Sequence, residues 1–309
     1  MPEKTPATAA GGDHTKDRAD ASKPRAGAEP GLWLVATPIG NLDDVSGRAL
    51  AVLASVDRIA CEDTRHTGRL LARYGIAGRL VSYHEHNAAR VRPGLIRTLA
   101  GGGSVALVAD AGTPLISDPG YRLVRAALDA GLRVTGCPGP SAPLLALILS
   151  GLPTDRFYVG GFLPPRQGPR RRALAALRLL DATLVFLESP RRLAGALSDM
   201  AATLGPRPAA VARELTKRHE EVRRGTLDRL AGHYASAGAP RGEVVVVVDG
   251  ARGGDAQPAL SDAEIDARLD TLLAAGSVRD AAAALSAETG LPRRELYARA
   301  LARARAGDA

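Results

Sequence analysis

The sequence predicts an α/β protein with two domains, the first built on a parallel sheet and the second on a mixed sheet, followed by a small all-helical module. Short apolar segments alternate with helical segments from residue 32 to residue 149, as in parallel sheets covered by helices. Beyond residue 151 some apolar segments follow one another with no helical segment between them, which favours a mixed sheet. Residues 261–309 contain only helical patterns.

The composition limits what the core and the partners can be. The chain has 309 residues, of which 45% are hydrophobic and only 3% aromatic, so the core must consist mainly of Ala, Val and Leu. The net charge is +8, and residues 31–260 hold 29 basic and 20 acidic residues. Such an excess on the folded body suits a polyanionic partner, and solubility of an arginine-rich chain is the alternative explanation.

The N-terminal segment and the cysteines bear on localisation. Residues 1–30 mix Ala, Gly, Pro and charges without periodicity, which predicts a disordered tail with no apolar signal core. No segment approaches the roughly 20 apolar residues of a membrane span. Cys61 and Cys137 each end a predicted buried strand without metal-ligand spacing, so we expect buried thiols in a cytoplasmic protein with no membrane partner.

The first domain is expected at residues 31–150. Ser46 is a suitable N-cap, and Gly75 and Gly131 follow predicted helix ends. The predicted strands are Leu32–Thr37, Arg58–Cys61, Leu80–Tyr83, Ser104–Asp110 and Arg133–Cys137. The predicted helices are Ser46–Ala54, Thr64–Tyr74, Arg90–Ala100, Tyr121–Ala130 and an apolar helix over residues 142–149.

The second domain is expected at residues 151–250, because Gly151 and Pro153 interrupt the chain there. Its predicted strands are Arg156–Gly160, Thr183–Glu188, Ala209–Glu214, Val222–Gly225 and Glu243–Asp249. Its predicted helices are Arg170–Leu180, Arg191–Thr203 and Leu227–Ala235.

A linker at residues 251–260 leads to the helical module at residues 261–309. Ser261 and Glu264 have the spacing of a capping box ahead of an apolar stripe. The segments Val278–Glu288 and Pro292–Ala302 then resemble a helix, a turn and a second helix. The net charge of this module is −1, with eight acidic and seven basic residues, which argues against DNA binding.

Four loops follow predicted strand ends: Pro38–Leu42, Glu62–His66, Asp110–Gly120 and Pro138–Ala142. The carboxyl ends of parallel strands share one edge of the sheet, so we expect these loops to line a ligand crevice. A plain strand-to-helix turn is the alternative for any single loop. Pro38 has no N–H to offer a phosphate, so a ligand without phosphates, such as S-adenosylmethionine, suits the first loop better.

Seven motifs along the chain carry a resemblance to a known family. They are residues 37–42 (TPIGNL), 62–65 (EDTR), 82–87 (SYHEHN), 110–120 (DAGTPLISDPG), 138–142 (PGPSA), 186–190 (FLESP) and 214–217 (ELTK). In this order they resemble ribosomal RNA small subunit methyltransferase I, the family of bacterial 16S rRNA cytidine 2′-O-methyltransferases in the tetrapyrrole-methylase superfamily. The helical module also resembles one that this family often carries.

The resemblance implies a two-domain tetrapyrrole-methylase-like fold, with S-adenosylmethionine in the cleft between the domains, and a homodimer. The relatives that act on porphyrins have Gly-Asp-Pro where this chain has Gly112-Thr113-Pro114, a difference that argues against a tetrapyrrole substrate. The cofactor contacts implied by the motifs are Pro38, Gly40, Leu42, Asp110, Gly112, Thr113, Ile116, Ser141, Ala142, Leu187 and Leu215.

The candidate catalytic residues are Glu62 and Asp63, which follow the second predicted strand. Either carboxylate could take the proton of a ribose hydroxyl, and the alternative is that they pair with Arg65 or cap the next helix. Arg65 is expected to hold an RNA phosphate or to pair with Asp63. His84 and His86 belong to the motif at residues 82–87, where we expect a polar loop that faces the substrate and no metal site.

Basic clusters in the second domain suggest contacts with RNA phosphates, which position a nucleic acid without reading its sequence. The alternative is a solvated basic face. The candidate phosphate contacts are Arg166, Arg170, Arg171, Arg172, Lys217 and Arg218, in addition to Arg65 of the first domain.

The function that follows from the resemblance is S-adenosylmethionine-dependent 2′-O-methylation of a cytidine ribose in the 16S rRNA of the small ribosomal subunit. One alternative is a methyltransferase of the same superfamily that acts on a tetrapyrrole. A second alternative is a non-catalytic protein that binds nucleic acid through its C-terminal helices, which we otherwise expect to contact rRNA or the subunit.

Overall fold

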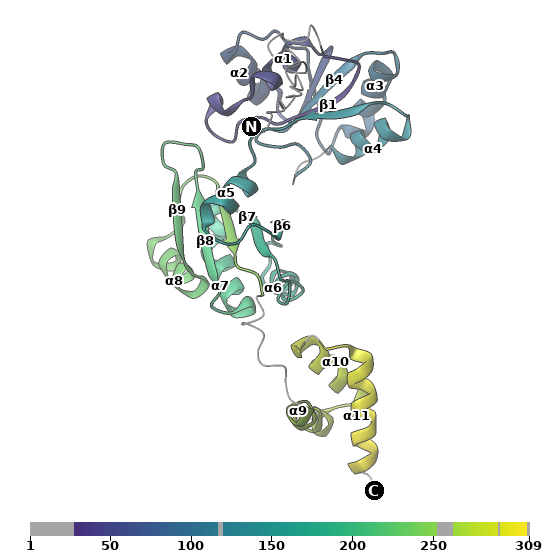
Figure 1. The fold of residues 1–309 in the computed structure, drawn as a ribbon, viewed down its shortest axis with the longest axis vertical. Coiled ribbons are helices and arrows are strands. Elements are labelled where there is room, and N and C mark those ends of the chain that lie inside the picture. Colours follow the sequence, from purple (N-terminus) through teal and green to yellow (C-terminus); the bar gives the residue numbers. More distant parts are fainter. Residues whose placement is uncertain (1–27, 117–119, 252–261, 290, 308–309) are drawn as a thin grey trace, which may run out of the picture. The chain divides into compact units, whose positions relative to one another are not determined.

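The computed structural model describes residues 28–116, 120–251, 262–289 and 291–307 (Figure 1). The chain divides into two compact units. The first extends to residue 140 but excludes residues 39–41, which belong with the second unit. The predicted tail and linker lie outside the described residues, apart from residues 28–30 and residue 251. Among the described residues, no helix is both long and apolar enough to span a membrane.

The first unit is a parallel α/β sandwich, as the sequence predicts. Its strands are β1 (Gly31–Val35), β2 (Arg58–Cys61), β3 (Leu80–Ser82), β4 (Ser104–Val108) and β5 (Val134–Cys137). Its helices are η1 (Leu42–Asp44), α1 (Gly47–Ser55), α2 (Thr64–Arg73), α3 (Ala88–Ala100) and α4 (Tyr121–Asp129). The strand order is β3-β2-β4-β1-β5, and all neighbours run parallel.

Alternating side chains of this sheet build two cores. Trp33, Val35 and Ile59 pack against α1 and α2 on one face. Leu32 and Leu107 pack against α3 and α4 on the other. The strands are therefore buried on both faces, which explains their nearly continuous apolar runs. β4 ends two residues before the predicted end, and Asp110 consequently lies in the following loop.

The second unit contains a mixed sheet, which confirms the prediction. Its strands are β6 (Phe157–Phe162), β7 (Thr183–Glu188), β8 (Pro208–Arg213), β9 (Glu221–Thr226) and β10 (Val244–Val248). Its helices are α5 (Ala142–Ser150), α6 (Gln167–Ala175), η2 (Pro190–Arg192), α7 (Leu193–Leu204) and α8 (Leu227–Ala237). The order is β6-β7-β10-β8-β9, in which only the β6–β7 pair is parallel.

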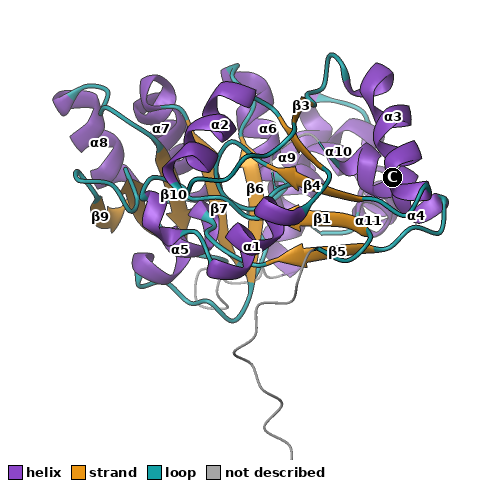
Figure 2. Cartoon of the chain, turned by 90° about the horizontal axis from the view of Figure 1, so that it is seen from above, coloured by secondary structure: helices purple, strands orange, loops and turns teal. Residues whose placement is uncertain are grey.

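Helices cover both faces of the second sheet (Figure 2). Helices α6, α7 and α8 pack on one face and α5 packs on the other. Helix α5 thus belongs to the second unit, whereas the sequence analysis assigned it to the first domain. The reason is that Ala146 and Leu147 bury their side chains against Val185, Val245 and Val247 of the second sheet, a contact that β-α alternation does not reveal.

The C-terminal helices α9 (Asp262–Ala275), α10 (Val278–Thr289) and α11 (Arg293–Gly307) have a core of their own. Arginines of α11 are bound to aspartates of α9: Arg299 Nε donates to Asp266 at 2.5 Å, and Arg303 Nε donates to Asp270 at 2.5 Å. These two arginines are therefore already paired within the module. The predicted capping box at Ser261 lies outside the described residues.

Acidification is expected to loosen this module. Hydrogen bonds from Arg299 and Arg303 hold the pKa of Asp266 and of Asp270 below the ordinary value of 3.8. Because the folded-state pKa is depressed, the stabilisation is complete above pH 3.8 and is lost as the pH falls below it. Amide hydrogen exchange of α9 and α11, corrected for its intrinsic pH dependence, should accelerate in that range.

The matched control is Asp266→Asn, which removes one of these carboxylates. Its α9 and α11 amides should exchange faster than those of the wild type at neutral pH and should respond less to acid. Equal protection of wild type and variant at neutral pH would show that the ion pairs contribute nothing to the module.

Candidate active site

Three loops of the first unit are joined by hydrogen bonds beyond the strand ends. Thr37 N donates to Gly112 O at 2.9 Å, and Gly112 N donates to Thr37 O at 3.0 Å. The Thr37 hydroxyl donates to Ala109 O at 3.0 Å, and the Thr113 hydroxyl donates to Pro140 O at 3.1 Å. The loops after β1, β4 and β5 thus meet at one edge of the sheet, as their positions after parallel strands predict.

The loop after β4 has an uncommon backbone conformation. Gly112 has a φ of +79° and Leu115 has a φ of +73°, although Leu115 carries a side chain. A non-glycine residue in this region costs on the order of 1–3 kcal/mol, and such residues cluster at binding sites. The side chain of Ile116, a predicted cofactor contact, is 41% exposed in this loop. The fold therefore maintains a strained loop that presents an apolar side chain to solvent.

The turn at Gly40 belongs to the second unit, where it touches the loop after β8. A Cβ on Gly40 would come within 2.5 Å of Lys217 Cγ and 2.8 Å of Thr216 Oγ1, so only glycine fits there. Asn41 N donates to Thr216 Oγ1 at 3.0 Å. Thr216 has a φ of +64°, a second strained position beside a predicted cofactor residue, Leu215.

The hydroxyl of Ser141 lacks a partner among the described residues. Ser141 is 8% exposed, its Oγ is buried, and it makes no capping bond to α5. A buried hydroxyl without a hydrogen bond is costly, so a polar ligand atom is a natural partner for it. Leu187 and Leu215 lie in the apolar cluster that also contains Ile39. Leu187 and Leu215 thus share one apolar cluster, and the buried Ser141 hydroxyl has no partner among the described residues.

Asp63 has a structural role, which favours the structural alternative considered for it. Its Oδ1 accepts from Arg65 N at 2.8 Å and thereby caps α2, and both its oxygens accept from the Arg65 guanidinium. Hydrogen bonds from the Arg65 side chain and backbone hold the pKa of Asp63 far below its usual range. Asp63 is consequently a poor proton acceptor, and Glu62 is the remaining candidate.

A pocket of about 600 Å³ opens in the first unit at the carboxyl ends of β2, β3 and β4. Asp63 N donates to Asp110 Oδ1 at 3.1 Å, which ties the turn after β2 to the loop after β4. The pocket is lined by Glu62, Asp63, Thr64, Arg65, Ser82, His84, Glu85, His86 and Asp110. Among the described residues, no group of His, Cys, Asp or Glu side chains has an arrangement that could hold a metal ion.

Asn87 is the last residue of the motif at residues 82–87, and it anchors the loop between β3 and α3. Its Oδ1 accepts from His84 N at 2.9 Å, and its Nδ2 donates to Ser82 O at 3.0 Å. Its place in that motif is the signal in the sequence, and the folded chain shows which backbone groups the side chain holds.

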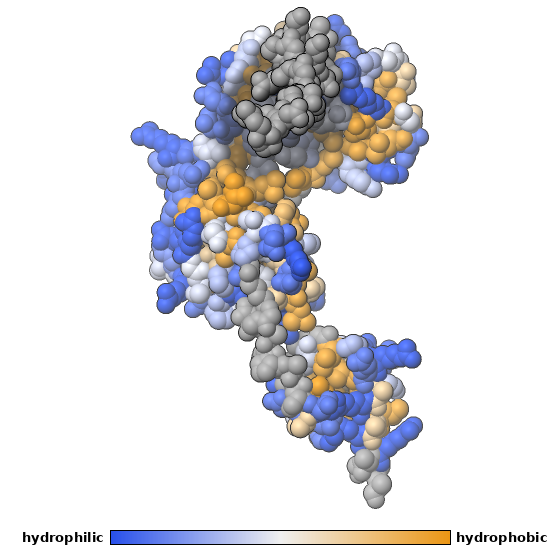
Figure 3. Space-filling model, viewed as in Figure 1, coloured by the Kyte–Doolittle hydropathy of each residue, from blue (hydrophilic) through white to orange (hydrophobic). Residues whose placement is uncertain are grey.

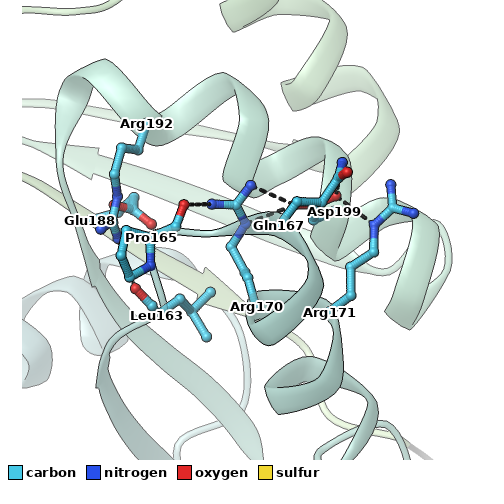
Figure 4. A network of polar contacts seen from close by, with 8 residues as sticks. All are labelled: Leu163, Pro165, Gln167, Arg170, Arg171, Glu188, Arg192 and Asp199. Carbon is cyan, nitrogen blue, oxygen red and sulfur yellow. Dashed lines mark hydrogen bonds and ion pairs between the residues drawn. The ribbon is translucent and has the colours of Figure 1, made fainter.

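The arginine cluster after β6 is divided between structural and exposed side chains (Figure 4). Arg170 is 7% exposed, and its Nε donates to Asp199 Oδ2 at 2.7 Å. Arg171 Nε donates to the other oxygen of Asp199, also at 2.7 Å. We therefore withdraw Arg170 from the predicted phosphate contacts, because a guanidinium buried against a carboxylate cannot reach RNA. Arg171 remains half exposed and bound to Asp199.

The other predicted phosphate contacts also differ in their pairing. Lys217 Nζ donates to Glu214 Oε1 at 2.9 Å and to Glu243 Oε2 at 3.2 Å. Within the described part of the chain, three predicted contacts have exposed guanidinium groups without a hydrogen bond or ion pair. These are Arg166, Arg172 and Arg218.

The two cysteines are buried and free, as predicted. Burial raises the pKa of both the Cys61 and the Cys137 thiol. Thiols in this state are poor nucleophiles, so neither is a candidate for the chemistry.

Comparisons with known proteins agree with this arrangement. The family model of the tetrapyrrole (corrin/porphyrin) methylases matches residues 31–231, and the model of the RsmI C-terminal HTH domain matches residues 259–304. Among solved structures, a uroporphyrin-III-C-methyltransferase from Thermus thermophilus has a TM-score of 0.51 at 26% identity, covering 70% of this chain and 93% of that chain. Diphthine synthase, at 18% identity, shares the fold with a TM-score of 0.55 over 71% of this chain and 89% of its own.

Curated relatives cover most of the chain. The ribosomal RNA small subunit methyltransferase I of Mesorhizobium japonicum is 54% identical over 274 residues, or 88% of this chain and 92% of the relative. The protein of the same name from Escherichia coli O157:H7 is 45% identical over 274 residues, or 87% of this chain and 94% of the relative. The chain therefore belongs to the tetrapyrrole methylase family and, within it, to the proteins named ribosomal RNA small subunit methyltransferase I.

Proposed function

We propose that this chain transfers a methyl group from S-adenosylmethionine to the ribose 2′-hydroxyl of a cytidine in the 16S rRNA of the small ribosomal subunit. The observation that carries the proposal is the identity of 54% to a relative named for methylation of small-subunit rRNA, over 88% of the chain. A ribosomal substrate would place the activity in the cytoplasm.

S-adenosylmethionine has polar and apolar parts, and the chain has side chains suited to both. The buried Ser141 hydroxyl is free to bond a polar atom of the ligand, and Ile116 and Leu42, each 41% exposed, can cover an apolar part. The proposed contacts are Pro38, Gly40, Leu42, Asp110, Gly112, Thr113, Ile116, Ser141, Ala142, Leu187 and Leu215.

When bound, S-adenosylmethionine supplies a methyl group that its sulfonium already activates. The residues of the chain then have to align the acceptor hydroxyl, exclude water and take up the hydroxyl proton. Glu62 is the proposed proton acceptor, because it lines the pocket at the end of β2 and its carboxylate makes no hydrogen bond or ion pair with any described residue. The ribose hydroxyl would give its proton to this carboxylate as its oxygen bonds the methyl carbon, and the bond from that carbon to the sulfonium sulfur would break, leaving a neutral thioether.

The decisive experiment is mass mapping of nucleosides after the purified protein has been incubated with labelled cofactor and either free 16S rRNA or small ribosomal subunits. We expect 2′-O-methylcytidine at one position in at least one of the two substrates. Labelling of a tetrapyrrole and not of rRNA would support the first alternative, and absence of cofactor binding would support the non-catalytic one.

Neutralising Arg166, Arg172 and Arg218 together by glutamine should weaken RNA binding and flatten its salt dependence. Each lost phosphate contact lowers the slope of log K against log salt by roughly 0.7–0.9. Filter binding at several salt concentrations measures this slope. The control is the triple change Arg178→Gln, Arg229→Gln and Arg241→Gln elsewhere in the second unit, and an equal loss of slope there would mean that only net charge matters.

We also propose a homodimer formed through an apolar face of the second unit. Leu144 and Ile148, which are 45% and 66% exposed, lie one turn apart on α5, where Figure 3 shows an apolar patch. Phe162 pairs with Leu187, whose side chain lies on the α5 face of the sheet, so the register puts Phe162 on the same face. β6 is also an edge strand, which favours a second copy as the occupant.

Ile148→Asp is expected to convert the dimer to a monomer, because it buries an unpaired charge in the apolar interface. Light scattering after size exclusion measures the mass. Leu179→Asp is the control, since Leu179 is also exposed but lies outside this face. A monomeric wild type, or dissociation by both variants alike, would refute this interface.

A further inference from the structure

The pocket at the ends of β2, β3 and β4 is distinct from most of the proposed cofactor contacts. In the sheet order β3-β2-β4-β1-β5, the joined loops carrying Thr37, Gly112 and Pro140 follow β1, β4 and β5. The pocket lies at the carboxyl ends of β2 and β3, which are on the opposite side of β4 from β1 and β5. Only Asp110 is both a pocket residue and a proposed cofactor contact. One edge of the sheet therefore carries two adjacent sites that share the loop after β4.

The outer wall of the pocket is built to keep its shape. Tyr83 N donates to Cys61 O at 2.7 Å, which fastens the end of β3 to the end of β2. Asn87 then bonds the backbone of His84 and of Ser82, closing the loop on itself. The His84 and His86 rings lie edge to face with their centroids 6.0 Å apart. Two imidazoles of this hydrogen-bonded loop thus line a polar pocket.

The charges inside the pocket exclude a phosphate and favour a nucleoside. Four carboxylates, of Glu62, Asp63, Glu85 and Asp110, face one guanidinium, that of Arg65. Carboxylates repel a phosphate, but they accept hydrogen bonds from ribose hydroxyls and from the amino group of cytosine. Aromatic rings such as imidazole stack on unpaired bases. The Arg65 side chain is 87% exposed and can hold a phosphate outside the pocket.

We infer that this pocket receives the acceptor nucleoside of the RNA, turned out of its stack, with His84 and His86 against the base and Asn87 as the positioning residue of the wall. The inference rests on the proposed function and adds the site of its substrate. Glu62 lies at the end of β2, one strand of about 4.8 Å from the shared loop after β4. The acceptor hydroxyl would thus reach Glu62 on the side of the pocket nearest the cofactor.

Chemical protection of the histidines tests the site without relying on activity. Diethyl pyrocarbonate modifies accessible imidazoles, and peptide mass spectrometry reports each histidine separately. In the wild-type full chain, 16S rRNA or small subunits should slow the modification of His84 and His86, and S-adenosylmethionine alone should leave both rates unchanged. His233 in α8 is the internal control. Protection by the cofactor alone would assign the pocket to the cofactor and overturn the inference, as would rRNA that is methylated while both histidines stay fully reactive.

Kinetics of two variants separate a positioning role from a general loss of fold. Asn87→Ala should raise KM for the RNA at least about tenfold, which corresponds to about 1.4 kcal/mol. His84→Ala should do the same, whereas His233→Ala should behave as wild type. The Kd of S-adenosylmethionine should stay at its wild-type value in all three. An unchanged KM in His84→Ala would refute the nucleoside pocket. A wild-type protein that methylates no RNA would instead refute the proposed function.

Discussion

Replacing Thr113 by arginine is expected to abolish binding of S-adenosylmethionine. Thr113 is half buried and its hydroxyl holds Pro140 O at 3.1 Å, so it joins the loops after β4 and β5. Arginine would break this bond and put bulk and positive charge beside the proposed position of the sulfonium. We expect Kd to rise at least about 100-fold, which is about 2.7 kcal/mol, as measured by titration calorimetry.

The control for this prediction is Thr113→Ser, which keeps the hydroxyl and should bind the cofactor as the wild type does. Both variants should show the far-ultraviolet circular dichroism of the wild type, because Thr113 lies in a loop beyond β4 and outside the two cores. Wild-type affinity in Thr113→Arg would mean that the cofactor binds elsewhere. The loop after β4 would then no longer be a cofactor-binding loop.

Replacing Asp199 by alanine is expected to destabilise the second unit by about 3–5 kcal/mol, the usual effect of removing one partner from a buried ion pair. The Asp199 side chain is 1% exposed and accepts from Arg170, Arg171 and Gln167 (Figure 4). Without it, the buried guanidinium of Arg170 keeps one hydrogen-bond acceptor among the described residues, Pro165 O at 3.1 Å. Denaturant unfolding followed by circular dichroism measures the loss.

An exposed pair provides the control for Asp199. Arg156 and Asp181 lie 2.9 Å apart with side chains 70% and 65% exposed, so Asp181→Ala should cost less than about 1 kcal/mol. Equal losses in the two variants would show that burial does not set the strength of the Asp199 network.

The contribution of the Asp199 network to the free energy of unfolding depends on pH. Burial alone would raise the pKa of Asp199, but hydrogen bonds from Arg171, Arg170 and Gln167 outweigh it and hold the pKa below 3.8. Because the folded-state pKa is depressed, the contribution is complete above pH 3.8 and is lost as the pH falls below it.

Local patterns in the sequence were sufficient to predict most of the strands and helices. β2 and β7 have the predicted bounds, and Ser46 caps α1 through a 3.1 Å bond to Ala49 N. The helix expected at Arg170–Leu180 instead spans Gln167–Ala175, so the sequence predicted the helix but placed both of its ends too late in the chain. Strand ends in a parallel sheet also predicted that the loops holding Thr37, Gly112 and Pro140 would meet.

The sequence by itself thus determined the fold class, the loops that meet at the sheet edge and the family, because periodicity and motifs are local properties of the chain. The tertiary structure decided which charged side chains remain free. Asp199 pairs with Arg170, 29 positions away in the sequence. The carboxylate of Asp63 pairs with Arg65, whereas that of its neighbour Glu62 does not. Partners of this kind are set by distance and burial in the folded state, where desolvation requires a buried charge to be paired and puts no such requirement on an exposed one.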